Sequence, residues 1–167
     1  MPLEVRNSAS SWTLMLRTFL LSTLVLVTAA QAAPSKPTRE VFGLRLGMSE
    51  ESAHKRLRRI ATQQKEEREE EEGEQEVWIL KKDARYNYLL TKFSREHRLT
   101  LVTVVAHPSC VRYSDLGETK NATVATDGTN YSYKWKIPAQ GKEKPVLLIA
   151  RGSNAEFLNS YSLYPSR

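Results

Sequence analysis

The sequence has few of the residues that define specialised chain classes. Its 167 residues include one cysteine, seven glycines, seven prolines and three histidines. A single cysteine cannot form an intramolecular disulfide, which excludes a small scaffold held by disulfides. The low glycine and proline content excludes a collagen-like or wholly disordered chain. Hydrophobic residues make up 40% and charged residues 26%, so the composition is that of a globular protein with a core.

Long hydrophobic runs are also lacking. The longest uncharged apolar run covers residues 18–30 (TFLLSTLVLVTAA), whereas a helix that crosses a bilayer needs about 20 apolar residues. Arg6 and Arg17 precede this run, and a small-x-small site, Ala30-Gln31-Ala32, stands at its end. This order is typical of a secretory signal peptide. We predict a signal peptide over residues 1–32 with cleavage after Ala32, no membrane span after cleavage, and a periplasmic or secreted protein.

The remaining length suits one domain. Residues 33–40 (APSKPTRE) predict a flexible lead-in, and residues 41–167 predict a single α+β domain. An acidic low-complexity tract at 66–76 holds eight glutamates and one arginine, although the whole chain has a formal net charge of +6. The tract either shields the basic body from polyanions or keeps a long connection solvated. The second reading is favoured, because like charges repel and the run holds nothing apolar.

The periodicity of apolar residues predicts one helix followed by a series of strands. Ser49 is a candidate N-cap for a helix from residue 50 to about 62, with Glu50 and Glu51 in its first turn. Before it, residues 41–46 suit a short strand or an extended arm. Short polar turns connect three predicted strands into an antiparallel meander, at 77–81, 86–94 and 99–107. The third is apolar on nearly both faces, which predicts a central strand covered on one side by the helix.

A second β-rich half follows residue 108. The predicted strands at 121–126 and 131–137 flank Asp127-Gly128, a dipeptide suited to a tight hairpin. Tyr131, Tyr133 and Trp135 alternate with polar residues, so this row is expected to face the core. Another strand is predicted at 146–151. Ser153 and Glu156 have the spacing of a capping box, which indicates a short terminal helix to about residue 161. No repeat of the first half is visible in the sequence.

One short motif resembles a known family. Residues 42–51 (FGLRLGMSEE), followed by the predicted helix and meander with Trp78, are similar to small exported bacterial domains of the SmpA/OmlA and β-lactamase-inhibitor-protein-like superfamily. The resemblance covers about residues 41–107. It implies a helical segment packed on one face of a β-sheet, structural roles for Leu46, Gly47, Met48 and Ser49, and a binding or assembly function. The Leu-Gly-x-Pro element that closes the helical part of that family is missing here, as is the acylated cysteine of its lipoprotein members.

The sequence has little that indicates catalysis or a cofactor. His54, His97 and His107 lie in three different predicted elements, with no cysteine or carboxylate at ligand spacing, so neither a metal site nor a cofactor is expected. No phosphate-binding glycine loop or nucleophile elbow is present. His107 and Cys110 suggest a small hydrolase or thiol enzyme, but three residues across a proline do not establish a catalytic pair. Cys110 is more simply a buried, inert side chain, and we expect no enzymatic activity.

The predicted helix carries the best candidate binding surface. Its basic face has four cationic residues: Lys55, Arg56, Arg58 and Arg59. They could meet phosphate, lipid head groups or an acidic partner, although exposed helix positions are ordinarily charged. The first functional hypothesis is an exported, non-enzymatic domain that binds a protein of the cell envelope. The alternative is a binder of polyanionic envelope material or another anionic surface through this helix face. Nucleic acid is a poor partner for an exported chain.

Overall fold

The computed structural model describes residues 36–64 and 75–166. These residues belong to one compact unit, Ala33–Arg167. The predicted signal peptide, the first three residues of the lead-in and most of the acidic tract lie outside the described residues. Among the helices that the structure describes, none combines the length and the apolar character that crossing a membrane requires.

Helix α1 (Glu50–Ile60) begins where the sequence predicts. The Ser49 side chain accepts a hydrogen bond from the backbone N–H of Ser52, which satisfies one free amide of the first turn. Acidic residues in the first turn and basic residues in the last turn complement the helix dipole. The predicted end near residue 62 is wrong by two residues. Strand β1 (Ala61–Gln64) starts directly after Ile60.

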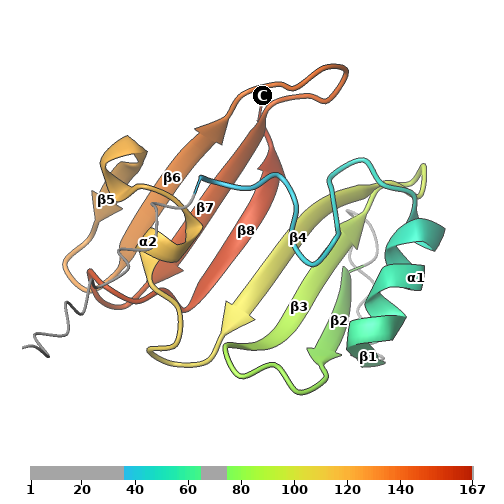
Figure 1. Cartoon of the computed structure of the whole chain (residues 1–167), viewed down its shortest axis with the longest axis horizontal. Coiled ribbons are helices and arrows are strands. Elements are labelled where there is room, and N and C mark those ends of the chain that lie inside the picture. Colours follow the sequence, from blue (N-terminus) through green and yellow to red (C-terminus); the bar gives the residue numbers. More distant parts are fainter. Residues whose placement is uncertain (1–35, 65–74, 167) are drawn as a thin grey trace, which may run out of the picture. The chain divides into compact units, whose positions relative to one another are not determined.

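The described strands form a single antiparallel sheet with the order β1-β2-β3-β4-β8-β7-β6-β5 (Figure 1). The three strands of the predicted meander are confirmed with small shifts at their ends, as is the hairpin at Asp127-Gly128. The bounds after β1 are β2 (Gln75–Leu80), β3 (Tyr86–Phe93), β4 (Leu99–Ala106), β5 (Thr123–Thr126), β6 (Tyr131–Ile137), β7 (Val146–Gly152) and β8 (Ser160–Pro165).

The two halves of the chain have the same element order. Each half places a helix before four antiparallel strands, and α2 (Tyr113–Leu116) with the 3-10 turn η1 (Thr119–Asn121) takes the place of α1 in the second half. The halves meet where β4 pairs with β8. The second β-rich half is therefore a continuation of one sheet. The expected helix on an antiparallel sheet is present, but the described chain is mostly β, so α+β holds only in a coarse sense.

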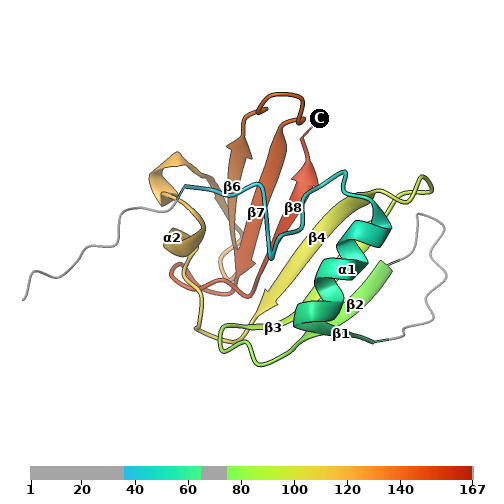
Figure 2. The same cartoon turned by 45° about the vertical axis from the view of Figure 1, so that its right-hand side comes forward.

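The core lies between the sheet and the segments on one of its faces. Figures 1 and 2 show α1, the arm that precedes it (residues 36–48) and α2 on the same side of the strands. Ala53 and Leu57 of α1 join one buried cluster with Trp78, Leu89 and other core residues of the strands. Strand β4 lies between β3 and β8 and alternates between buried and half-buried residues. The predicted central position of this strand is confirmed.

Two local predictions are wrong. The expected terminal helix over residues 153–161 is a turn followed by strand β8. The Asn154 carboxamide oxygen accepts hydrogen bonds from the backbone N–H groups of Glu156 and Phe157, so the chain reverses instead of starting a helix. Residues 41–46 form no regular strand, because Val41 and Leu44 pair across a tight turn in which Gly43 has a φ of 79°.

The aromatic row of β6 packs as predicted. Trp135 is buried, and Tyr133 stacks on Tyr113 of α2 with ring centroids 4.1 Å apart. The Tyr113 hydroxyl donates to the backbone oxygen of Asn154 at 3.3 Å. Burial, together with the neighbouring phenols Tyr133 and Tyr131, raises the pKa of Tyr113 to about 12.

This shifted pKa predicts a loss of stability in alkali. A group whose folded pKa lies above its unfolded value favours folding below the unfolded pKa, here about 10, and loses that contribution as the pH rises through the folded pKa. We expect the free energy of unfolding to fall between pH 10 and about 12. Urea unfolding at several pH values measures this. In Tyr113→Phe the free energy of unfolding should fall less steeply with pH between pH 10 and about 12. The same fall in the variant and the wild type would contradict a raised pKa of Tyr113.

Candidate functional site

The four basic residues predicted as a binding face are all exposed on α1, but they do not converge. Arg56 lies against Gly43 of the preceding arm, whereas Arg58 lines a hollow on another side of the helix. Residues two apart on an α-helix point about 200° from one another, which separates these two side chains. The positive charges of Lys55, Arg56, Arg58 and Arg59 are therefore spread around α1, and these four side chains do not line a common pocket.

A buried carboxylate lies beside α1. Glu76 of β2 is only 6% exposed, and four side chains direct polar atoms at its two oxygens. The distances are 2.9 Å from His54 Nε2, 3.0 Å from Gln63 Nε2, 2.9 Å from Trp78 Nε1 and 3.2 Å from Thr91 Oγ1. Such a charge is stable in a protein interior only with hydrogen-bond partners. The prediction that the acidic tract at 66–76 is solvated is therefore wrong for Glu76.

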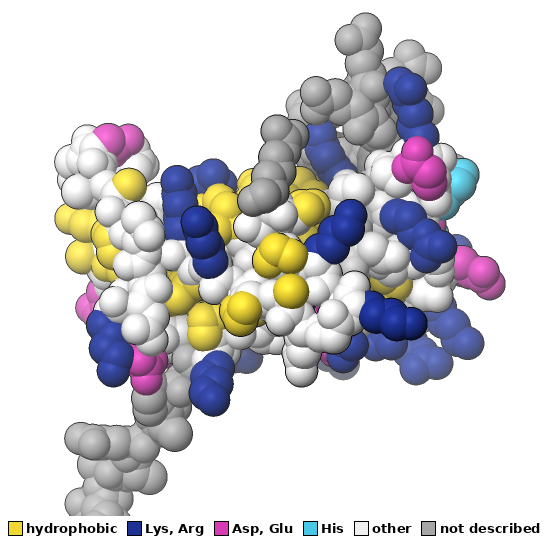
Figure 3. Space-filling view, turned by 90° about the horizontal axis from the view of Figure 1, so that it is seen from above, with side chains coloured by type: hydrophobic (Ala, Val, Ile, Leu, Met, Phe, Trp, Pro, Cys, Tyr) yellow, Lys and Arg dark blue, Asp and Glu magenta, His cyan; other side chains and the backbone are white. Residues whose placement is uncertain are grey.

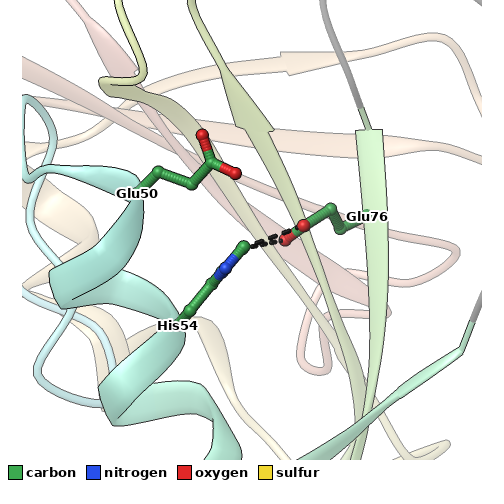
Figure 4. A group of neighbouring side chains, drawn as sticks. All are labelled: Glu50, His54 and Glu76. Atoms are coloured by element: carbon green, nitrogen blue, oxygen red, sulfur yellow. Dashed lines mark hydrogen bonds and ion pairs between the residues drawn. The ribbon is translucent and has the colours of Figure 1, made fainter.

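Two further side chains extend this group to the surface. Glu50 lies one helical turn before His54, so both residues lie on the same side of α1. The Glu50 carboxylate is 2.6 Å from His97 Nδ1 in the turn between β3 and β4. The ligand atoms of Glu50, His54 and Glu76 all lie within 4.8 Å of one another. Figure 4 shows their side chains directed toward a common centre, with His54 bonded to Glu76. We call these three residues the carboxylate-histidine cluster.

A hollow of about 550 Å³ opens next to the cluster. Its lining combines acidic, basic and imidazole groups, namely Ser49, Glu50, Glu51, His54, Arg58, Glu96, His97 and Arg98. A hydrogen bond involving the Ser94 side chain lowers the pKa of Glu96, which favours the ionised form. The site offers imidazole nitrogen and carboxylate oxygen beside solvent. Imidazole and carboxylate groups are the kinds of side chain that bind divalent metals or exchange protons in proteins.

The structure places two histidines and Cys110 differently from what the sequence predicts. Two of the three histidines, His54 and His97, reach the same hollow although they lie in separate elements. Cys110 is exposed, so the expectation of a buried thiol is wrong. Its Sγ donates to the backbone oxygen of Pro108 at 3.4 Å. Among the described residues, His107 contacts Cys110 through a backbone hydrogen bond of the turn.

Comparisons with family models, curated proteins and solved structures gave no match.

A second hollowed region lies where the arm before α1 meets the loop between β6 and β7. Two adjoining hollows of about 840 and 460 Å³ share Arg39, Arg45 and Glu143. Apolar side chains contribute to their lining, among them Phe42, Leu46, Leu99, Ile137, Pro145 and Val146. Figure 3 shows hydrophobic side chains on the upper face of the molecule with Lys and Arg around them. We call this region the cationic groove.

Charge in the cationic groove is predominantly positive. Its lining carries two carboxylates, Glu40 and Glu143, against five basic residues, Arg39, Arg45, Arg98, Lys142 and Lys144. Arg39 connects the two sides of the groove, because its side chain donates hydrogen bonds to Glu143 and to the backbone oxygens of Pro138 and Lys144. These bonds hold the arm against the β6–β7 loop. Lys142 and Lys144 remain exposed at the rim.

Proposed function

We propose that this chain is an exported, non-enzymatic binding domain of the bacterial cell envelope that acts through contacts with a protein partner. The observation that carries the proposal is the cationic groove, which combines apolar lining with an excess of basic side chains. Apolar area supplies binding energy, and basic side chains around it select an acidic partner. The occupant that fits is a partner segment in which apolar and acidic residues alternate.

The absence of an enzymatic role is part of this proposal. It is supported by the surroundings of Cys110, whose thiol is exposed and bonded to a backbone carbonyl. A nucleophile needs a base within hydrogen-bond reach and a third group that orients the base. Replacing Cys110 with serine should therefore leave partner binding unchanged. Loss of binding in that variant alone would favour the thiol-enzyme alternative.

The runner-up is a binder of polyanionic envelope material through the basic face of α1. It depends on the four exposed residues Lys55, Arg56, Arg58 and Arg59. Binding to a polyanion is mainly electrostatic and weakens steeply as salt screens the charges. Binding in the cationic groove has an apolar component that salt does not screen. The two surfaces are therefore separable by matched charge reversals and by salt.

We expect the double substitution Lys142→Glu with Lys144→Glu to weaken binding of an acidic peptide by at least about tenfold. The matched control is Lys55→Glu with Arg59→Glu, which changes the net charge of the full chain by the same amount. The probes are a labelled peptide of alternating glutamate and leucine, an all-glutamate peptide, and inorganic polyphosphate. Fluorescence anisotropy at about 0.15 M salt, where the screening length is about 8 Å, gives each affinity.

The outcomes distinguish the hypotheses. Under the groove proposal, the alternating peptide binds more tightly than the all-glutamate peptide, and only the Lys142/Lys144 variant loses it. Loss only in the Lys55/Arg59 variant, with polyphosphate as the tightest ligand, would favour the helix-face alternative. Equal losses in both double variants, or affinity that neither variant changes, would contradict both. A stoichiometric envelope protein captured by the wild-type chain should likewise be lost only with the groove variant.

A further inference from the structure

The structure points to a zinc site at the carboxylate-histidine cluster, with Glu50, His54 and Glu76 as the protein ligands. This inference is independent of the proposed binding function. Zinc is bound in proteins by histidine nitrogen and carboxylate oxygen at about 2.0–2.2 Å. Tetrahedral ligands around such an ion lie about 3.4 Å apart. The cluster already holds its donor atoms within 4.8 Å of one another, with His54 Nε2 and Glu76 at 2.9 Å.

The two deeper ligands are fixed by their surroundings. Glu76 is held by hydrogen bonds from Gln63, Trp78 and Thr91, which would remain when an ion replaces the contact with His54. Hydrogen bonds of this kind orient ligating carboxylates and commonly change metal affinity 10–100-fold when removed. The His54 ring lies 5.4 Å from the ring centroid of Trp78 and 5.5 Å from that of Phe93, so its orientation is also constrained.

Glu50 is the adjustable ligand. Its side chain is 27% exposed and can move toward the other two donors by rotation without disturbing the core. His97 Nδ1 bonds its carboxylate at 2.6 Å, which makes His97 a positioning residue and leaves it outside the ligand set. The fourth position of the ion would face the 550 Å³ hollow. That hollow also gives the ion a path from solvent.

The charge around the cluster favours a cation. Glu51 and Glu96 line the same hollow as Glu50, and with Glu76 the four carboxylates outnumber the two arginines of the lining, Arg58 and Arg98. Magnesium and calcium prefer sites made only of oxygen. One imidazole with two carboxylates suits zinc or a similar transition ion. The ion would link α1 to β2, so it would act as a clamp between the helix and the sheet.

The test is metal binding by the full untagged chain after treatment with a chelator. We expect one Zn²⁺ per chain by competition with a chromophoric indicator, and a visible absorption band of tetrahedral cobalt when Co²⁺ is added instead. Glu50→Gln should weaken binding by at least about tenfold, and His97→Asn should weaken it about 10–100-fold through loss of orientation. The matched controls are Glu51→Gln and Glu96→Gln, which change acids of the same hollow that are not ligands.

Thermal unfolding gives a second readout. An ion that binds only the folded chain raises the unfolding temperature, and a tighter-binding ion raises it more, so at the same Zn²⁺ concentration the wild type and both control variants should be stabilised more than Glu50→Gln. His54→Gln should abolish binding, and if that variant fails to fold, Glu50→Gln alone decides the test. No tetrahedral cobalt band, or equal weakening in Glu51→Gln and Glu50→Gln, would overturn the site.

Discussion

Replacing Glu76 with alanine is expected to lower the free energy of unfolding by about 3–5 kcal/mol. The substitution removes a carboxylate that is 6% exposed and leaves four side chains without their acceptor, namely His54, Gln63, Trp78 and Thr91. Removing this acceptor costs more than a single exposed hydrogen bond is worth, because Trp78 and Thr91 are buried and their donors stay desolvated. Urea unfolding followed by tryptophan fluorescence, with a chelator present, measures the change.

Two variants make this result interpretable. Glu96→Ala removes an exposed carboxylate near the same hollow and should change stability by less than about 0.5 kcal/mol. Glu76→Gln keeps one acceptor oxygen and should fall between the wild type and Glu76→Ala. If Glu76→Ala costs less than about 1 kcal/mol, water satisfies the four donors and the cluster is not a stabilising element of the fold.

Trp135→Ala should destabilise the chain by about 3–5 kcal/mol, the range found for removal of a large buried aromatic side chain. Trp135 is 2% exposed and belongs to the central hydrophobic cluster. Its Nε1 donates to the backbone oxygen of Glu118 at 3.1 Å, and its ring stacks on Tyr133 with centroids 6.0 Å apart. The substitution removes the packing and one of the two hydrogen bonds that the Glu118 oxygen accepts, the other coming from the Asn121 backbone N–H.

The control for Trp135 is the next residue of β6. Lys136 is exposed on the opposite side of the strand, so Lys136→Ala should be nearly neutral. Because both halves belong to one sheet, Trp135→Ala and Glu76→Ala should each shift a single cooperative transition. Separate transitions for the two halves would contradict a common folding unit.

Much of the local structure follows from the sequence, because helix capping and strand alternation are local signals. The helix start at Ser49 and the strand at 131–137 were predicted for this reason. Strand β1 was missed because its residues, ATQQ, do not alternate between apolar and polar. It becomes a strand by pairing with β2. The terminal strand β8 was missed because the Ser153–Glu156 spacing suggests a capped helix, whereas Asn154 organises a turn.

The strand order depends on contacts that no local pattern contains. Thr103 of β4 bonds Ser162 of β8 at 2.8 Å across 59 positions of the chain. Short turns predict the pairing of neighbouring strands such as β2–β3–β4 and β5–β6, yet nothing in either half identifies β4 and β8 as partners. The equivalence of the halves is likewise visible in the order of elements and not in the residues, since the Gly-Met-Ser motif has no counterpart in the second half.

The carboxylate-histidine cluster was only partly visible in the sequence. Glu50 and His54 have the four-residue spacing that places two side chains on one side of a helix. The expectation that no carboxylate lies at ligand spacing from a histidine is therefore wrong. Glu76 is the last glutamate of an acidic run, and composition cannot distinguish a buried member of such a run from its solvated neighbours. The alternation of Glu76 with Trp78, both directed to the core, is the sequence feature that indicates its burial.

The pairing of β4 with β8 makes the beginning of the fold dependent on its end. Domains are synthesised from the N-terminus, so β4 leaves the ribosome long before Ser160–Pro165 exists to cover its free side. During that interval its unpaired backbone groups and apolar side chains form a bare sheet edge, which is a template for joining another copy. A chain cut short before β8 would keep that edge permanently, and its fate would be aggregation, even with every residue of its first half intact.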